Sequence, residues 1–228
     1  MKNFAKFLEK ELKPYNLLNH PFYKSWNEGT LQKDTIKDYA KQYYHHVKAF
    51  PRYLSAAHSI CENIAQRKIL LENLNDEENN GTDHPTLWRD FALGAGNNKK
   101  SLDASSVDSY TQNLIDTFFK NCRSSYAEGL AAIYTYEHQI PEIATTKIDG
   151  LKKHYGITDN KSLKFFYVHE KADVWHREQC ELLLNQLTDE EKKKALVAGK
   201  ETAKALWSFL SGIALKHNML TETQEYVQ

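Results

Sequence analysis

One short stretch, FFYVHEKADVWHREQ at residues 165–179, sets two imidazoles and a carboxylate at spacings of four and three residues. In a helix each residue turns the chain by about 100°, so His169, Asp173 and His176 fall on one face, within an arc of roughly 60°. Two nitrogen donors and one oxygen donor on one face are suitable ligands for a transition metal. A solvated polar stripe has the same spacing, so the triplet alone leaves both interpretations open.

Three further candidates lie in two other stretches. Glu77 and His84, in NLNDEENNGTDHPTLW, are separated by Asn80-Gly81, which predicts the end of a helix. These two residues converge only if the end of one helix meets the start of the next. Glu137, in YTYEHQIPEIA, is flanked by apolar and aromatic residues, which is unusual for a solvent-facing glutamate. The alternatives are a solvated helix end for Glu77, a position next to an N-cap for His84, and a buried ion pair for Glu137.

The three stretches together supply three carboxylates and three histidines from separate helices. Helical bundles that bind two iron or manganese ions use inward-facing carboxylates and imidazoles, including a carboxylate three residues before a histidine, as in Asp173 and His176. Such ligands suit Fe(II) or Mn(II). The cysteines, Cys61, Cys122 and Cys180, form no C-x-x-C motif, which speaks against a structural zinc or an iron–sulfur site.

The elements that must position these residues are all predicted to be helices. Pro51 predicts a kink or a break near residues 48–50, Pro141 predicts a disturbance in a later helix, and Thr188-Asp-Glu-Glu191 is a capping-box pattern. No segment shows the alternating pattern of a strand. The sequence predicts an all-α bundle of about seven to eight helices, from apolar periodicity over 3–13, 31–64, 66–79, 84–96, 107–121, 124–149, 160–186 and 188–216.

Composition and charge narrow the classes of partner. Lys and Arg number 30 and Asp and Glu also number 30, which gives no electrostatic reason to expect nucleic acid or an acidic membrane. No apolar run approaches the roughly 18 residues of a membrane span, and the odd cysteine count fits a reducing compartment. We expect a cytoplasmic protein with a single domain over residues 1–217 and a polar tail over 218–228.

Several long motifs, in the same order along the chain, carry a resemblance to a known family. HPFYKSW, YAKQYYHHVKAFPRYLSAAHS, LLLENLNDEEN, AAIYTYEHQIPEIATTKIDGL and HEKADVWH lie between about residues 16 and 215. They resemble the heme-oxygenase-like superfamily of TenA thiaminases and PqqC proteins, and within it the proteins like the Chlamydia protein associating with death domains (CADD-like). The resemblance implies a seven- or eight-helix bundle, commonly a homodimer, with an Fe/Fe or Mn/Fe centre. By motif its ligands are the six residues that spacing selected, Glu77, His84, Glu137, His169, Asp173 and His176.

The resemblance also implies an activity. CADD-like proteins are implicated in making 4-aminobenzoate for folate, with a metal site that activates O2 and a product cut from a tyrosine of the protein itself. By motif, the tyrosine that is cut is Tyr23. The resemblance also implies that Tyr39 and Tyr136 lie near the metals and carry a radical. It implies that Lys147 donates the amino group. From the residues alone, tyrosines at helical spacing are core packing and Lys147 is a surface lysine.

Three other functions are considered at this point. A TenA-like thiamine-salvage hydrolase needs a nucleophilic cysteine and no metal, and neither Cys122 nor Cys180 lies in that motif. Metal-free ring oxidation of the PqqC type would leave six metal-type ligands without a purpose. From a different class, the resemblance implies a death-domain-binding modulator of apoptosis, exported to a host, although nothing in the sequence specifies such a surface.

Overall fold

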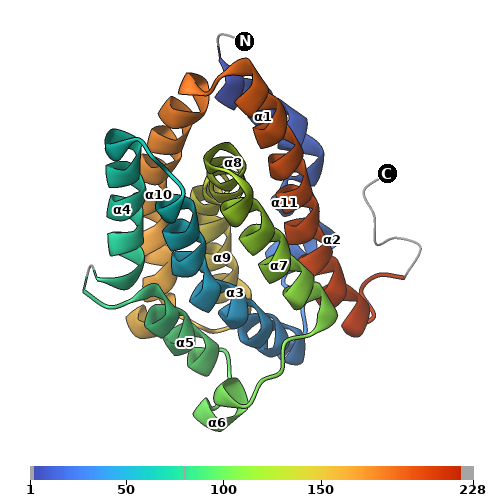
Figure 1. Cartoon of the computed structure of the whole chain (residues 1–228). Helices are drawn as coiled ribbons and strands as arrows, with labels where there is room; N and C mark the ends of the chain where they lie inside the picture. The colour runs from blue at the N-terminus through green and yellow to red at the C-terminus, as the bar shows by residue number, and fades with distance from the viewer. Residues whose placement is uncertain (1–2, 80, 222–228) are drawn as a thin grey trace.

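The structure is a computed structural model. It describes residues 3–79 and 81–221, except for the side chains of residues 171–173. Within these residues the regular secondary structure is entirely helical (Figure 1). The helices are α1 (Phe4–Leu12), α2 (Pro21–Glu28), α3 (Lys33–Ser59), α4 (Ile64–Glu78), α5 (His84–Gly94), α6 (Lys99–Asp103), α7 (Ser109–Ser124), α8 (Tyr126–Glu137), α9 (Ile140–His154), α10 (Asn160–Gln186) and α11 (Asp189–Lys216), with 3-10 turns at Lys13–Tyr15 and Leu17–Asn19.

The predicted all-α class is confirmed, with three local corrections. The described residues form more helices than the seven to eight predicted, because α2 and α6 are short helices that apolar periodicity did not reveal. The segment 124–149 is two helices, and Pro141 lies in the first turn of the second, where a missing N–H costs nothing. The predicted break near Pro51 does not occur, since α3 runs through it without interruption. Of the predicted tail, residues 222–228 lie outside the described residues.

Side-chain caps define where the helices that carry the candidate ligands begin. The side chain of Asn63 accepts hydrogen bonds from the first turn of α4, Asp83 does so for α5, and Asp159 for α10. Each such cap contributes about 1 kcal/mol. The Asp83 cap makes His84 the first residue of α5, so the position of this histidine follows from the local sequence.

Helix α8 is the centre of the bundle. In Figure 1 it lies between α10 and α11, and α3 and α7 also pack on it. From Ala127 to Glu137 only Glu128 is not buried. A helix that is apolar on nearly all sides belongs inside a bundle. The same position places Glu137, the last residue of α8, in the protein core.

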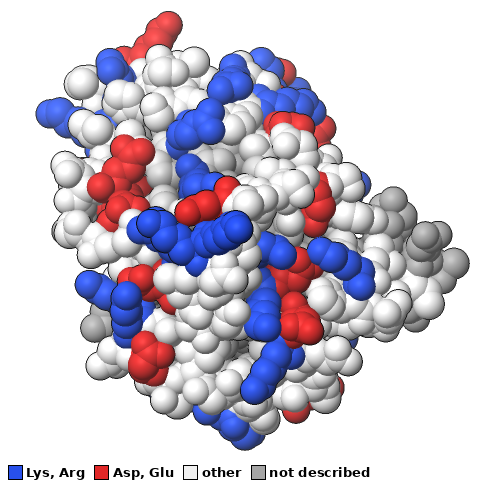
Figure 2. Space-filling model, turned by 90° about the horizontal axis from the view of Figure 1, so that it is seen from below, with Lys and Arg blue, Asp and Glu red and all other residues white. Residues whose placement is uncertain are grey.

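Charge is distributed over the surface without a single-sign patch on the face shown in Figure 2, where acidic and basic side chains lie interspersed. This matches the equal numbers of acidic and basic residues in the sequence. Among the helices described here, none is long and apolar enough to cross a membrane.

The close approach of α2 and α9 depends on Gly150. A Cβ atom at this position would lie 2.4 Å from Nε1 of the fully buried Trp26. We expect Gly150→Ala to lower the free energy of unfolding by about 1–2 kcal/mol, because the overpacking outweighs the gain in helix propensity. Urea unfolding measures this change, with the exposed neighbour Asp149→Ala as control. An alanine variant as stable as the wild type would contradict the close packing.

Candidate metal centre

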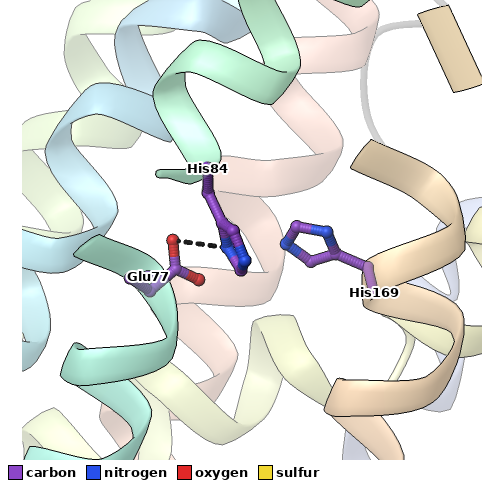
Figure 3. A group of neighbouring side chains, drawn as sticks. All are labelled: Glu77, His84 and His169. Carbon is purple, nitrogen blue, oxygen red and sulfur yellow. Dashed lines mark ion pairs between the residues drawn. The ribbon is translucent and has the colours of Figure 1, made fainter. Parts of the chain in front are cut away.

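Three buried side chains from three helices converge in the core (Figure 3). Glu77 comes from α4, His84 from α5 and His169 from α10. One ligand atom of each lies within 4.8 Å of the others. The Glu77 Oε2 atom is 2.9 Å from His84 Nδ1, and the rings of His84 and His169 have centroids 4.4 Å apart. Figure 3 shows Glu77 and His84 facing each other while His169 reaches toward them from α10.

Glu77 and His84 meet because one lies at the end of α4 and the other at the start of α5. Helix α4 ends at Glu78 and α5 begins at His84. The seven-residue spacing is therefore not two turns of one helix. It joins the end of one helix to the start of the next, the condition under which the sequence predicted that the two side chains would meet.

Glu137 and His176 form a second pair. The Glu137 Oε1 atom is 3.9 Å from His176 Nδ1, and both side chains are buried. The sixth predicted ligand, Asp173, has a side chain that lies outside the described residues. The structure thus groups the other five predicted ligands as one triplet and one pair.

Backbone and side-chain acceptors orient two of the histidines. His169 Nδ1 donates to the carbonyl oxygen of Phe165 at 2.7 Å, which leaves Nε2 as the nitrogen with a lone pair. His176 Nε2 donates to Asp76 Oδ2 at 2.9 Å, which leaves Nδ1 toward Glu137. Burial, with a smaller contribution from His84, holds the pKa of His169 well below its usual value, so this ring is neutral. A neutral, hydrogen-bonded imidazole is the form that binds metals.

Glu137 is also held by two residues that the sequence did not assign to the metal site. Asn73 Nδ2 donates to Glu137 Oε1 at 2.6 Å, and Cys180 Sγ donates to Oε2 at 3.5 Å. Asn73 lies one helical turn before Glu77 on α4, on the same face. Helical spacing from a predicted ligand was the signal that could have identified it.

The donor set fits a transition-metal ion. Metal–nitrogen and metal–oxygen bonds of about 2.0–2.2 Å place two donors around one ion no more than roughly 4.4 Å apart. The triplet, within 4.8 Å, is close to that spacing. One carboxylate and two imidazoles are ligands that suit Fe(II) or Mn(II), and the second pair adds one of each kind.

The predicted tyrosines lie in one buried cluster. Tyr23 Oη and Tyr39 Oη are 3.4 Å apart, and Tyr43 Oη donates to Tyr136 Oη at 2.9 Å. The rings of Tyr39 and Tyr43 are stacked, with centroids 5.4 Å apart. Burial raises the pKa of Tyr23 and of Tyr39, so both phenols keep their protons. Tyr43 links the two pairs, although the sequence motifs did not select it for a role.

Lys147 is buried, and its prediction from the residues alone as a surface lysine is wrong. Only 3% of its surface is exposed. Its Nζ atom lies 5.8 Å from the ring centroid of Tyr23 and 5.1 Å from those of Tyr39 and Tyr43. Among the described side chains no carboxylate pairs with it, and burial lowers the pKa of its ammonium to about 7.

The candidate centre lies in the closed core and not in an open cleft. A surface cavity of about 860 Å³ is lined by residues of α1, α8, α9 and α10, including Tyr134, His138 and Arg177. None of the five described candidate ligands lines it. Enclosure limits the access of bulk water to the ligands.

Comparison with known proteins adds sequence and fold relatives. A family model described as iron-containing redox enzyme matches residues 37–208. The chain is similar to a 4-aminobenzoate synthase of Chlamydia muridarum, with 39% identity over 209 residues that cover 91% of this chain and 89% of that protein.

Solved structures show the same fold. A TenA homologue from Pseudomonas syringae has a TM-score of 0.79 and 17% identity, with 93% of each chain covered. A CADD-like protein of unknown function from Nostoc punctiforme has a TM-score of 0.72 and 18% identity, covering 93% of this chain and 97% of that one. The resemblance drawn from the sequence motifs is confirmed.

Proposed function

Because this chain belongs to the family of iron-containing redox enzymes, we propose that it is a 4-aminobenzoate synthase that uses two transition-metal ions and O2. The cluster of Glu77, His84 and His169 carries the proposal. Burying a carboxylate and two imidazoles costs stability that apolar side chains would not cost. The 39% identity to a protein of that name, over about nine-tenths of both chains, supports the product.

The proposed ligands of an Fe/Fe or Mn/Fe pair are Glu77, His84, Glu137, His169, Asp173 and His176. When bound, the ions would supply the oxidising power of O2 for chemistry on an aromatic ring. The chain's own contribution is to keep His169 neutral, to orient His176 through Asp76, and to exclude water from the core.

We propose that the aromatic ring of the product comes from Tyr23. Its phenol already contains the six-carbon ring of an aminobenzoate, and cleavage of its Cα–Cβ bond would release that ring. Tyr39 and Tyr136 are the proposed radical carriers. The hydroxyl contacts between Tyr23 and Tyr39 and between Tyr43 and Tyr136, joined by the stacked Tyr39 and Tyr43 rings, support a route between them.

Lys147 is the proposed amino donor. With a pKa of about 7, roughly half of its amine is unprotonated at neutral pH and carries a lone pair. An exposed lysine is almost fully protonated at that pH. The buried position of Lys147 beside the rings of Tyr23, Tyr39 and Tyr43 therefore supports a reactive amine where the product would form.

Tyr23→Phe tests the source of the ring. We expect the variant to form no 4-aminobenzoate in the presence of Fe(II), Mn(II), a reductant and O2, because phenylalanine lacks the phenol oxygen through which the ring is oxidised. Mass spectrometry of the wild-type peptide around position 23 should show loss of the side chain after turnover. Tyr15→Phe is the control, since Tyr15 packs against Trp207 outside the tyrosine cluster. Wild-type product levels from Tyr23→Phe would place the ring source elsewhere.

The hydrolase alternative has less support. Cys122 is fully buried, and burial raises the pKa of its thiol to about 12, which opposes thiolate formation. Cys180 donates its S–H to Glu137. The homodimer, the cytoplasmic location and the death-domain partner stay predictions of the sequence, and gel filtration with purified chain tests the first of them.

A further inference from the structure

Helix α4 buries an unusual set of side chains. Its fully buried residues are Leu70, Asn73 and Glu77. A helix on the outside of a bundle normally turns an apolar stripe toward the core. Two of these three residues are polar, and Asn also has a lower helix propensity than Leu. An apolar residue at position 73 would suit the fold better unless the amide has a specific partner.

The partner of Asn73 is Glu137, 64 residues away on α8. Asn73 Nδ2 donates to Glu137 Oε1 at 2.6 Å, in a buried contact. Asn73 Oδ1 is buried and has no hydrogen-bond partner among the described residues. Turning the amide over would set Oδ1 against the carboxylate oxygen, so the donor is assigned to Nδ2. A buried acceptor without a partner destabilises the fold, so only the donor side of this amide gives the position a favourable contact.

The contact leaves Glu137 able to bind a metal. A carboxylate has about four lone-pair sites, so Oε1 can accept from Asn73 and still present a lone pair on its other side. Cys180, on α10, donates its S–H to the second carboxylate oxygen, Glu137 Oε2. The Glu137 carboxylate is thereby fixed between three helices, with Oε1 3.9 Å from His176 Nδ1.

We propose that Asn73 is a positioning residue that orients Glu137 and sets the metal affinity of the Glu137–His176 half of the centre. This inference deepens the proposed function and rests on it, because it assumes that Glu137 and His176 bind a metal. The other half, Glu77 with His84 and His169, is held by the Glu77–His84 contact and by the Phe165 carbonyl, without Asn73. Loss of the amide therefore affects the two halves unequally.

The test is a titration of metal-free protein with Co(II), followed by visible absorption and calorimetry. Asn73→Leu keeps the branched shape of the side chain but has no donor. We expect it to weaken one of the two binding steps by about 10–100-fold, the usual effect of losing an outer partner of a ligand, and to leave the other step unchanged. The matched control is Asn75→Leu, because Asn75 is an exposed asparagine on the same helix. It should bind as the wild type does.

Two outcomes overturn the proposal. Equal binding by Asn73→Leu and the wild type at both steps would make Asn73 a packing residue. An equal weakening of both steps with a lower melting temperature would make its effect a general loss of structure. The titration does not depend on product formation. Suppose that the wild type binds two Co(II) ions and that Asn73→Leu weakens only one of the two steps. If the wild-type protein then forms no 4-aminobenzoate, the proposed function is refuted and this inference stands.

Discussion

His169→Ala protein is expected to lose its bound metal and to form no 4-aminobenzoate, while keeping its helices. His169 is buried, neutral and one of the three donors that lie within 4.8 Å of each other. Loss of a partner outside the ligand set commonly costs about 10–100-fold in metal affinity, so loss of a ligand should cost at least that much. Elemental analysis after loading with Fe(II) and Mn(II) should find about two ions per wild-type chain.

The control for this experiment is His58→Ala, which removes a partly exposed histidine from the last turn of α3. It should keep both metal and product. Circular dichroism checks that helix content is retained in each variant. Glu137→Ala is expected to behave like His169→Ala, because it removes a ligand of the second pair. Full activity from either variant without bound metal would rule out the dimetal mechanism.

Lys147→Met is expected to abolish 4-aminobenzoate formation and, at the same time, to stabilise the protein at neutral and acidic pH. The methionine side chain has a similar length and no charge. The wild-type fold must bury an ammonium whose pKa falls from 10.5 to about 7. At about 1.4 kcal/mol for each tenfold change in the protonation equilibrium, removal of that ammonium stabilises the folded state by up to a few kcal/mol.

The stability gain of Lys147→Met should depend on pH in one direction. Below pH 7 the lysine is charged in the folded and the unfolded chain, and the burial penalty is complete. Between pH 7 and 10.5 only the unfolded chain binds the proton, so wild-type stability rises with pH and the gap closes. Urea unfolding at pH 6 and pH 10 measures this, with exposed Lys153→Met as control.

Either half of this prediction can fail separately. A stability difference that is the same at pH 6 and pH 10 would show that the buried ammonium is not its cause. Product formation by Lys147→Met at the wild-type level would assign the amino group to another donor. A variant that is more stable and inactive would show that the fold keeps a destabilising lysine for its chemistry, a common trade-off at active sites.

Most of the long helices were predictable from sequence because their formation depends on contacts within three or four residues. Apolar periodicity and the capping box at Thr188 act locally, and α11 begins where this capping box predicts. The local rule failed at Pro51. This proline is buried within α3, on which α4, α5, α7 and α8 pack, and this tertiary packing offsets the one backbone hydrogen bond that the proline removes.

The proposed metal ligands were also chosen from the sequence, since spacing and motif both selected the same six residues. What only the tertiary structure decided is how residues from distant helices meet. It brought His169 beside His84, placed Asn73 and Cys180 against Glu137, and enclosed Lys147 among aromatic rings. These contacts span tens of residues and depend on how whole helices pack. No local pattern encodes such packing, so a lysine that sequence assigns to the surface becomes the buried amine beside Tyr23.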